Sequence, residues 1–230
     1  MFVAERAAAA PSRHDYVASI PVAPAPHLYA VTKRALDLAL SLVFLIVALP
    51  LLPLIGLLVR LDSPGPIVFR QRRVGRGGRV FYFYKFRTMH PDSRERFPDL
   101  YAYRYTRQGF LQMLDKSPHD PRLTRLGRKL RTTSLDELPN LLNVLRGDMS
   151  LVGPRPELPE MLAYYSDEEL TKFSVLPGVT GLWQVSGRSS LTKAQQLAID
   201  IDYIKQRSLL FDLGILMRTA RVVCLRIGAF

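Results

Sequence analysis

The chain has 230 residues, carries 32 Lys and Arg against 20 Asp and Glu, and has a formal net charge of +12 at neutral pH. This positive charge predicts an anionic partner such as nucleic acid, anionic lipid or a phosphorylated substrate. The single cysteine, Cys224, excludes an internal disulfide, and the four scattered histidines lack metal-ligand spacing, which argues against a zinc site.

The first segment reads as a tail. Residues 1–30 are rich in alanine and proline and show no hydrophobic periodicity. Such a segment cannot bury enough apolar surface to order itself. It also lacks the apolar run and the cleavage site of a secretory signal. The sequence therefore predicts a disordered tail over residues 1–30 and a single domain over residues 31–230.

A long apolar run follows the tail. The stretch LALSLVFLIVALPLLPLIGLLV, residues 38–59, contains no charged side chain. As a straight helix it would reach about 33 Å, which is enough to cross a hydrocarbon core of about 30 Å. Pro50 and Pro53 interrupt it, and basic residues flank both ends, which favours the cytoplasmic side for both. The sequence predicts a proline-broken, re-entrant membrane helix over residues 33–60, and a proline-kinked crossing helix is the alternative.

Two residues add detail to this segment. Leu49 precedes Pro50 and is expected to leave the helical region, because the proline ring clashes with a helical residue before it. Asp37 favours a shallow position for the first half of the segment, because the free-energy cost of a charge in the membrane is lowest near the lipid headgroups.

The remaining patterns predict a mixed α/β fold that is mainly helical. Apolar and basic residues alternate on both sides of GRGG, which indicates a β-hairpin over residues 67–87 with turn glycines. Residues 91–120 are polar, interleave tyrosine with arginine, and favour a loop or short helices. Residues 122–131 have the spacing of a basic amphipathic helix, which suits either an anionic membrane surface or solvent. Two further helices are expected over residues 192–207 and 209–227.

Two adjacent acids, Asp136 and Glu137, stand among several basic residues in LRTTSLDELPNLLNVLRGDMSLVGPRPE, residues 130–157. One interpretation is structural. Ser134 and Glu137 fit a capping box, and Asp136 as the cap would instead place a proline in the first helical turn. In either register Asp136 sits at the positive end of a helix, where phosphate also binds favourably.

Arginines at fixed positions favour a chemical role for these acids. Arg155 lies between two prolines that fix the backbone, which gives a preorganised guanidinium suited to bidentate phosphate contact. Further along, PGVTGLWQVSGRSS places Arg188 beside a loop glycine. Acids beside such arginines, next to a membrane-inserting helix, suit phosphoryl transfer to or from a lipid. A carboxylate nucleophile makes sense there, because an acyl phosphate can pass its phosphoryl group to a second acceptor. Magnesium would normally hold the anionic oxygens near the carboxylates.

From about Lys33 to the C-terminus the chain resembles the bacterial sugar transferases, the monotopic polyprenyl-phosphate phosphoglycosyl transferases. The matching motifs occur in family order and are KRALDLALSL, PGPIVFRQRRVG, FYKFRTM, RTTSLDELPNLLNVLRGDMSLVGPRPE and PGVTGLWQVSGR. The short length and the closing VVCLRIGAF are most similar to the hexose-phosphate transferases that start exopolysaccharide synthesis, commonly with galactose.

The resemblance implies transfer of a sugar 1-phosphate from a UDP-sugar to undecaprenyl phosphate, with release of UMP, at the cytoplasmic face of the bacterial inner membrane. It places the family's catalytic dyad and its magnesium on Asp136 and Glu137, with Asp136 as the covalent nucleophile. Its basic phosphate contacts fall on Arg131, Arg155, Lys85 and Arg188. The identity of the sugar and the uridine contacts stay open.

The resemblance also bears on the membrane segment. It implies a re-entrant helix broken at Pro50 and several amphipathic helices at the lipid interface. Relatives often carry serine before that proline, where a hydroxyl can bond the freed backbone. Leu49 cannot do this, so Pro53 or neighbouring side chains are expected to help stabilise the bend.

One alternative from another class is a membrane-tethered basic protein that binds nucleic acid or acts as a scaffold. The charge and the interleaved tyrosines and arginines of residues 91–120 favour it. It gives no reason for acids placed among arginines, so the sequence predicts a transferase without a nucleic-acid partner.

Overall fold

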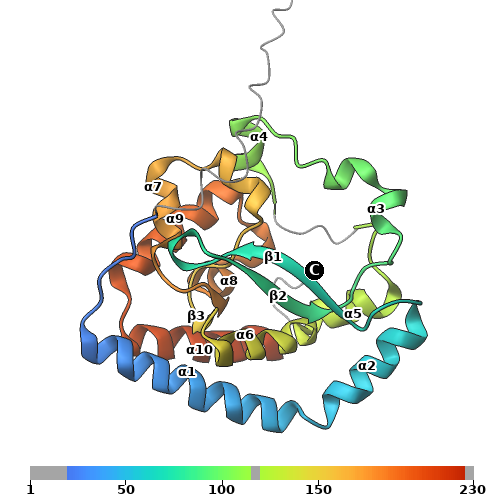
Figure 1. Ribbon diagram of the computed structural model, residues 1–230, viewed down its shortest axis with the longest axis horizontal. Coiled ribbons are helices and arrows are strands. Elements are labelled where there is room, and N and C mark those ends of the chain that lie inside the picture. The colour runs from blue at the N-terminus through green and yellow to red at the C-terminus, as the bar shows by residue number, and fades with distance from the viewer. Residues whose placement is uncertain (1–19, 115–119, 226–230) are drawn as a thin grey trace, which may run out of the picture.

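A computed structural model describes residues 20–114 and 120–225 and shows a mixed α/β fold that is mainly helical, as expected (Figure 1). The longer helices are α1 (His27–Ala48), α2 (Leu51–Asp62), α5 (Arg125–Thr133), α9 (Lys193–Gln206) and α10 (Leu209–Cys224). The shorter helices are α3 (Ser93–Arg96), α4 (Arg107–Gln112), α6 (Leu141–Arg146), α7 (Asp167–Leu170) and α8 (Leu182–Ser186). The strands are β1 (Val68–Val74), β2 (Val80–Phe86), β3 (Ser150–Val152) and β4 (Gly178–Thr180). The 3-10 turns η3 (Leu135–Asn140) and η6 (Arg188–Ser190) carry residues of the site.

The predicted tail is described only in its last part. Residues 1–19 lie outside the described residues. Residues 20–26 run along the protein, where the backbone N–H of Ala23 donates to the carbonyl of Ser174 at 3.0 Å. Residues 27–30 already form the first turn of α1. Contact with the protein therefore begins earlier in the chain than residue 31.

The apolar run forms two helices, and their axes differ by 62°. Pro50 stands immediately before α2, so the break lies at the expected proline. Pro53 lies in the first turn of α2, where a backbone N–H has no partner within the helix, so the missing N–H of proline costs nothing. The prediction that Pro53 interrupts the helix is therefore wrong. Leu49 keeps helical angles (φ −50°, ψ −45°), so the expectation that it leaves the helical region is wrong. The bend itself relieves the clash with the proline ring.

Both helices of this bent pair lie along the same side of the protein (Figure 1). α1 contacts α6 and β3, and α2 contacts α5. The opposite faces expose large apolar side chains, among them Val43, Ile46, Val47, Leu54, Leu57 and Leu61. Among the described helices no single one is long and apolar enough to cross a membrane, whereas the bent pair together has the required length and composition.

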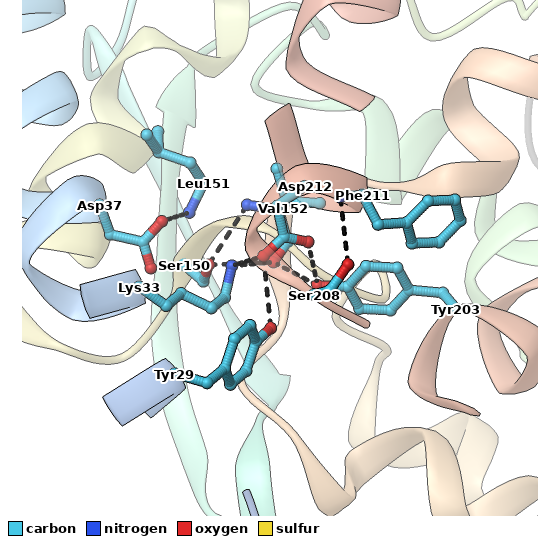
Figure 2. A network of polar contacts seen from close by, with 10 residues as sticks. All are labelled: Tyr29, Lys33, Asp37, Ser150, Leu151, Val152, Tyr203, Ser208, Phe211 and Asp212. Atoms are coloured by element: carbon cyan, nitrogen blue, oxygen red, sulfur yellow. Dashed lines mark hydrogen bonds and ion pairs between the residues drawn. The ribbon is translucent and has the colours of Figure 1, made fainter. Parts of the chain in front are cut away.

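A buried polar network fixes α1 to β3 and α10 (Figure 2). Lys33 Nζ lies 2.7 Å from Asp212 Oδ2, and the Tyr203 hydroxyl donates to Asp212 Oδ1 at 2.8 Å. Asp37, 4% exposed, accepts the backbone N–H of Leu151 at 3.1 Å. Asp37 therefore faces the protein and not the lipid headgroups, because a strand N–H satisfies its carboxylate.

The hairpin of β1 and β2 confirms the prediction over residues 67–87. The strands pair antiparallel from Val68 opposite Phe86 to Val74 opposite Val80. In the turn, Gly77 and Gly78 have φ of 66° and 82°, a region that glycine enters at no steric cost.

The parallel pair of β3 and β4 was not predicted. Ser150 lies opposite Gly178 and Val152 opposite Thr180. Strands of three residues are too short to show an alternating pattern. The core packs around this pair and contains Phe81, Phe83, Leu141, Val144, Met149, Leu151, Val152, Tyr203 and Ile215.

The amphipathic helix predicted near residue 122 is α5, which starts after Thr124. The Thr124 hydroxyl caps it by accepting the N–H of Gly127 at 2.9 Å. Its apolar face, including Leu126 and Leu130, packs with Ile55 and Val59 of α2. Another part of the chain thus covers this face, whereas Arg125, Arg128 and Lys129 are exposed, as the alternative of a solvated surface helix predicts. The two later helices are confirmed as α9 and α10, and α10 exposes Leu210, Leu213 and Met217. The last residues expected in α10, 226–227, lie outside the described part.

Candidate active site

Asp136 and Glu137 lie in the 3-10 turn η3, directly after α5. Ser134 ends α5 with a left-handed φ of 58°. Because a 3-10 turn repeats every three residues, Leu135 and Leu138 point to one side, where both pack with buried apolar residues. These leucines anchor the turn and leave the two acids to line a common cavity. The Asp136 side chain is deeply placed, since the residue is 5% exposed.

The helix-cap interpretation of these acids is wrong in both registers. An N-cap needs extended backbone, whereas Ser134 is left-handed and makes no side-chain capping bond. Its Oγ instead accepts from Arg188 Nη2 at 3.1 Å. Asp136 does not precede a helix either, because α6 starts after Asn140 and Pro139 lies inside η3.

Arg155 reaches the dyad from the loop after β3. The loop is held against β4, where the N–H of Gly153 donates to the Thr180 carbonyl at 3.0 Å and the N–H of Gly178 to the Pro154 carbonyl at 2.9 Å. Arg155 Nη2 lies 2.8 Å from Glu137 Oε1. The guanidinium that the sequence predicted for phosphate therefore pairs with a dyad carboxylate in this structure.

Lys85 of β2 and Arg131 of α5 add positive charge beside Asp136. Burial and the nearby Arg131 charge lower the pKa of Lys85 to about 7, against the opposing effect of Asp136. Burial also lowers the pKa of Arg131, which Asp136 and Asp120 oppose. Arg131 is held in place, because its Nε donates to Thr88 Oγ1 at 3.2 Å and its Nη1 lies 3.9 Å from Asp120 Oδ2.

Arg188 enters the site from η6, where its φ is 48°. Burial lowers the pKa of its guanidinium, the Glu137 carboxylate raises it, and Arg155 lowers it further. Arg188 is thus electrostatically coupled to the dyad. Of the predicted site residues, the structure places Asp136, Glu137, Arg155 and Arg188 on one cavity, and puts Lys85 and Arg131 where they interact with the charge of Asp136.

The cavity has a volume of about 260 Å³ and two kinds of wall. The dyad and the two arginines belong to its lining. Apolar side chains form much of the rest, and they include Phe44 of α1, Trp183 of α8 and Val222 of α10. A site that joins charged groups to an apolar helix suits a ligand with a polar head and an apolar body.

Glu157 is a residue that sequence reasoning missed. It follows Arg155 by two positions, and its carboxylate binds Lys193 of α9 and accepts from the Tyr165 hydroxyl at 2.9 Å. Burial alone would raise the pKa of Glu157, but the charges of Lys193, Lys172 and Arg73 hold it well below its ordinary value. Glu157 thereby anchors the end of the loop that carries Arg155. In the sequence, the only signal for this role is the position of Glu157 directly after GPRP. No sequence pattern pairs Glu157 with Lys193.

Asp136 and Glu137 are the candidates for holding a metal. Among the described residues no group of three or more His, Cys, Asp or Glu side chains could hold an ion. Mg²⁺ in phosphoryl-transfer sites is commonly bound through one or two carboxylates together with substrate phosphates. Two adjacent carboxylates at the wall of a cavity fit this pattern.

Several known proteins are similar to this chain in sequence. The chain is 43% identical over 198 residues to the undecaprenyl-phosphate galactose phosphotransferase of Salmonella typhimurium, covering 86% of this chain and 41% of the relative. It is 38% identical over 200 residues to the exopolysaccharide production protein ExoY of Sinorhizobium fredii, covering 87% and 88%. It is 45% identical over 195 residues to the UDP-glucose:undecaprenyl-phosphate glucose-1-phosphate transferase of Caulobacter vibrioides, covering 81% and 67%.

These relatives differ in length. The chain spans about two fifths of the Salmonella protein and most of the Sinorhizobium one. Residues 28–226 match the bacterial sugar transferase family, and this range contains every residue of the cavity described above. The protein belongs to the bacterial sugar transferase family.

Proposed function

We propose that this protein transfers a sugar 1-phosphate from a UDP-sugar to undecaprenyl phosphate and releases UMP, as the first membrane step of exopolysaccharide or related glycan synthesis. The names of the Salmonella and Caulobacter relatives support this acceptor, and the Caulobacter name supports a UDP-sugar donor. One observation carries the proposal. The Asp136–Glu137 dyad shares a cavity with Arg155 and with Phe44 of the apolar helix α1.

In the first step, a carboxylate oxygen of Asp136 attacks the phosphorus atom that carries the sugar. The bond from this phosphorus to the UMP oxygen breaks, and UMP leaves with the electron pair. Asp136 then holds the sugar phosphate as an acyl phosphate. Arg155 and Arg188 lie on the same cavity and oppose the negative charge that gathers on the phosphoryl oxygens.

In the second step, a phosphate oxygen of the lipid attacks the same phosphorus. The bond to the Asp136 oxygen breaks, the carboxylate is restored, and the sugar leaves joined to the lipid through a diphosphate. Neither step takes up or releases a net proton, so a carboxylate nucleophile needs no general base.

Magnesium is part of the proposal. Asp136 and Glu137 would hold it, and the ion would supply charge neutralisation at the transferring phosphate. Glu137 pairs with Arg155 in this structure.

We also propose that residues 31–230 act as one monotopic domain whose bent pair enters and leaves the cytoplasmic leaflet of the inner membrane. Each helix of the pair packs on the protein with one face and exposes apolar side chains on its other face. The net charge of +12 suits the anionic cytoplasmic leaflet.

Cysteine labelling tests this topology. His27→Cys and Asp62→Cys, each in a Cys224→Ser background, place single thiols at the two ends of the bent pair. Both thiols should resist an impermeant thiol reagent in intact cells and react after permeabilisation. Labelling of one position alone in intact cells would show a crossing segment.

Nucleic-acid binding has weaker support. Its best feature was the stretch of tyrosine and arginine, and there the Tyr101 ring lies 5.4 Å from the Arg94 guanidinium and 5.0 Å from that of Arg122. The Tyr101 ring is therefore engaged by arginines of the chain itself.

A half-reaction tests the covalent mechanism. Purified enzyme given labelled UDP-sugar and no lipid should release UMP once and retain the sugar phosphate on a peptide containing Asp136, and hydroxylamine should release it. Asp136→Asn should form no adduct, whereas Asp202→Asn, at an exposed position on α9, should behave as wild type. A strict need for lipid before any UMP appears would show direct transfer instead.

A further inference from the structure

We propose that a second pocket of this protein, separate from the active-site cavity, binds a phosphate group carried by a lipid headgroup or by a small soluble molecule. The pocket lies where the start of α1 meets the end of α9, the turn of the β1–β2 hairpin and residues 174–176. Its volume is about 110 Å³, less than half that of the active-site cavity, and none of the described residues lines both. The site goes beyond the transfer reaction, which does not use it.

The lining of this pocket is basic. It includes four cations, which are Lys33, Arg34, Arg76 and Arg207. Among the described residues of the lining only Asp37 is acidic. Asp212 adds a second carboxylate by pairing with Lys33 at 2.7 Å (Figure 2). Four cations against two carboxylates leave an excess of two positive charges. An excess of partly enclosed charge is costly without a counter-charge, so the pocket suits an anion.

Arg207 offers an unused hydrogen-bond donor to this pocket. Its Nη2 donates to the Pro24 carbonyl at 2.5 Å, which ties the chain before α1 to the end of α9. Its Nη1 is buried and has no hydrogen-bond partner among the described residues. A buried N–H group without an acceptor carries a desolvation cost, and the oxygen of an anion would remove that cost.

Arg34 and Arg76 keep their positive charge in different ways. Arg34 donates to the carbonyls of Val144 and Leu145 at 2.6 and 3.0 Å, and these neutral partners fix the guanidinium without neutralising it. Arg76 lies on the hairpin turn, is exposed, and makes no ion pair with the described residues. Because a guanidinium can bind phosphate through two parallel N–H bonds, arginines on several sides of a small pocket favour a phosphate group over a carboxylate.

The surface beside the pocket favours a phospholipid as the source of the phosphate. Tyr29 lines the pocket, and its neighbour Leu28 on α1 is 77% exposed. Leu210, three residues after Arg207, is 82% exposed. Acyl chains would lie over such apolar side chains while the phosphate reaches the arginines. Anionic lipids are the lipids that attract basic groups at a membrane surface, so an anionic headgroup fits best.

Calorimetric titration of the full-length protein in a neutral detergent tests the site with two probes, dioctanoyl phosphatidylglycerol and glycerol 3-phosphate. Arg207→Gln should raise the dissociation constant of the lipid probe about ten- to hundredfold, because a charged hydrogen bond to phosphate is lost. Arg76→Gln should raise it about two- to fivefold, since exposed ion pairs are weaker. Lys205→Gln, exposed on α9 and outside the pocket, removes the same charge and is the matched control.

The active-site cavity keeps its arginines in every variant, so a difference from wild type reports on this pocket. Dependence on Arg207 for the lipid probe alone would identify a headgroup, and the same dependence for glycerol 3-phosphate would show that a free phosphate suffices. Unchanged dissociation constants of both probes in Arg76→Gln and Arg207→Gln, or an equal loss in Lys205→Gln, would overturn the site. The single release of UMP should be unchanged in Arg76→Gln, so failure of the transfer mechanism and failure of this site are distinguishable.

Discussion

Two clusters of acidic and basic side chains in this protein contain the same residue types but have different roles. The dyad cluster, Asp136, Glu137, Arg155 and Arg188, lines the cavity. The sealed cluster, Glu157, Lys172, Lys193 and Asp200, lies between α9 and the segments before it, and the side chains of its Lys172–Asp200 pair are 4% and 1% exposed. In the sealed cluster each carboxylate has an ammonium partner, as a buried charge requires.

Around the dyad the acids and two of the arginines line a cavity. Lys85 and Arg131 add to the charge of the two arginines, so basic side chains outnumber the carboxylates there. A surplus of buried positive charge is costly for folding and useful for a ligand that brings phosphates. Basic groups also outnumber carboxylates in the sealed cluster, because Arg73 Nη1 lies 3.7 Å from Glu157 Oε1. Accessibility to a ligand, more than residue type, therefore distinguishes a reacting cluster from a structural one.

The largest expected effect separates the two clusters by activity. Asp136→Asn should lower transfer by at least about a thousandfold, because the amide cannot act as the carboxylate nucleophile. Transfer is compared per folded molecule, because the amide also removes the carboxylate charge beside Lys85 and Arg131. Measurable transfer by pure Asp136→Asn enzyme would remove Asp136 from the role of nucleophile.

Asp200→Asn should show the reverse behaviour. It leaves the buried Lys172 ammonium without its carboxylate partner, which costs about 3–5 kcal/mol of unfolding free energy. Activity per folded molecule should be largely kept. Adding Lys172→Met should recover part of the stability, because it removes the stranded charge. A stable but inactive Asp200→Asn enzyme would break the distinction between the clusters.

A smaller effect is expected from Arg155→Lys. Lysine keeps the charge and can still pair with Glu137, but it loses the planar fork that binds phosphate in two places. A charged hydrogen bond contributes about 1.5–3 kcal/mol, which is about ten- to two-hundredfold in kcat/KM for the donor. The variant should remain folded, as judged by its unfolding temperature. Wild-type kinetics in Arg155→Lys would mean that only charge is needed at this position.

The sequence predicted the parts of the site that local rules govern. Pro50 marks the break in the apolar run, and the prolines around Arg155 fix its loop. The helix cap at Ser134 was mispredicted because a capping-box pattern does not reveal a left-handed backbone.

Long-range pairs could not be predicted in the same way. Lys33 meets Asp212 across 179 positions, and Glu157 meets Lys193 across 36. The basic residues before the apolar run, taken as a topology signal, thus also act as anchors: Arg34 donates to the carbonyls of Val144 and Leu145 at the end of α6. A single sequence carries no pattern that joins such partners, because their proximity follows from the packing of whole elements.

The smallest expected effect concerns pH and Lys85. Its pKa is lowered to about 7 in the folded protein, so the free enzyme loses this positive charge as the pH rises through that value. Because phosphate binds the ammonium form better, kcat/KM for the UDP-sugar should fall several-fold between about pH 7 and 8.5, whereas kcat should fall less, since bound phosphate raises the pKa. Lys85→Arg stays protonated and should lose this alkaline fall.

The lowered pKa of Lys85 also makes the stability of the fold depend on pH. Between about pH 7 and the ordinary lysine value of 10.5, the unfolded chain binds a proton that the folded one has released. The contribution of Lys85 to stability should therefore rise with pH across this window, and Lys85→Met should remove that rise. An alkaline fall in kcat/KM that persists in Lys85→Arg would assign the titration to another group and leave Lys85 without a charged role toward the donor.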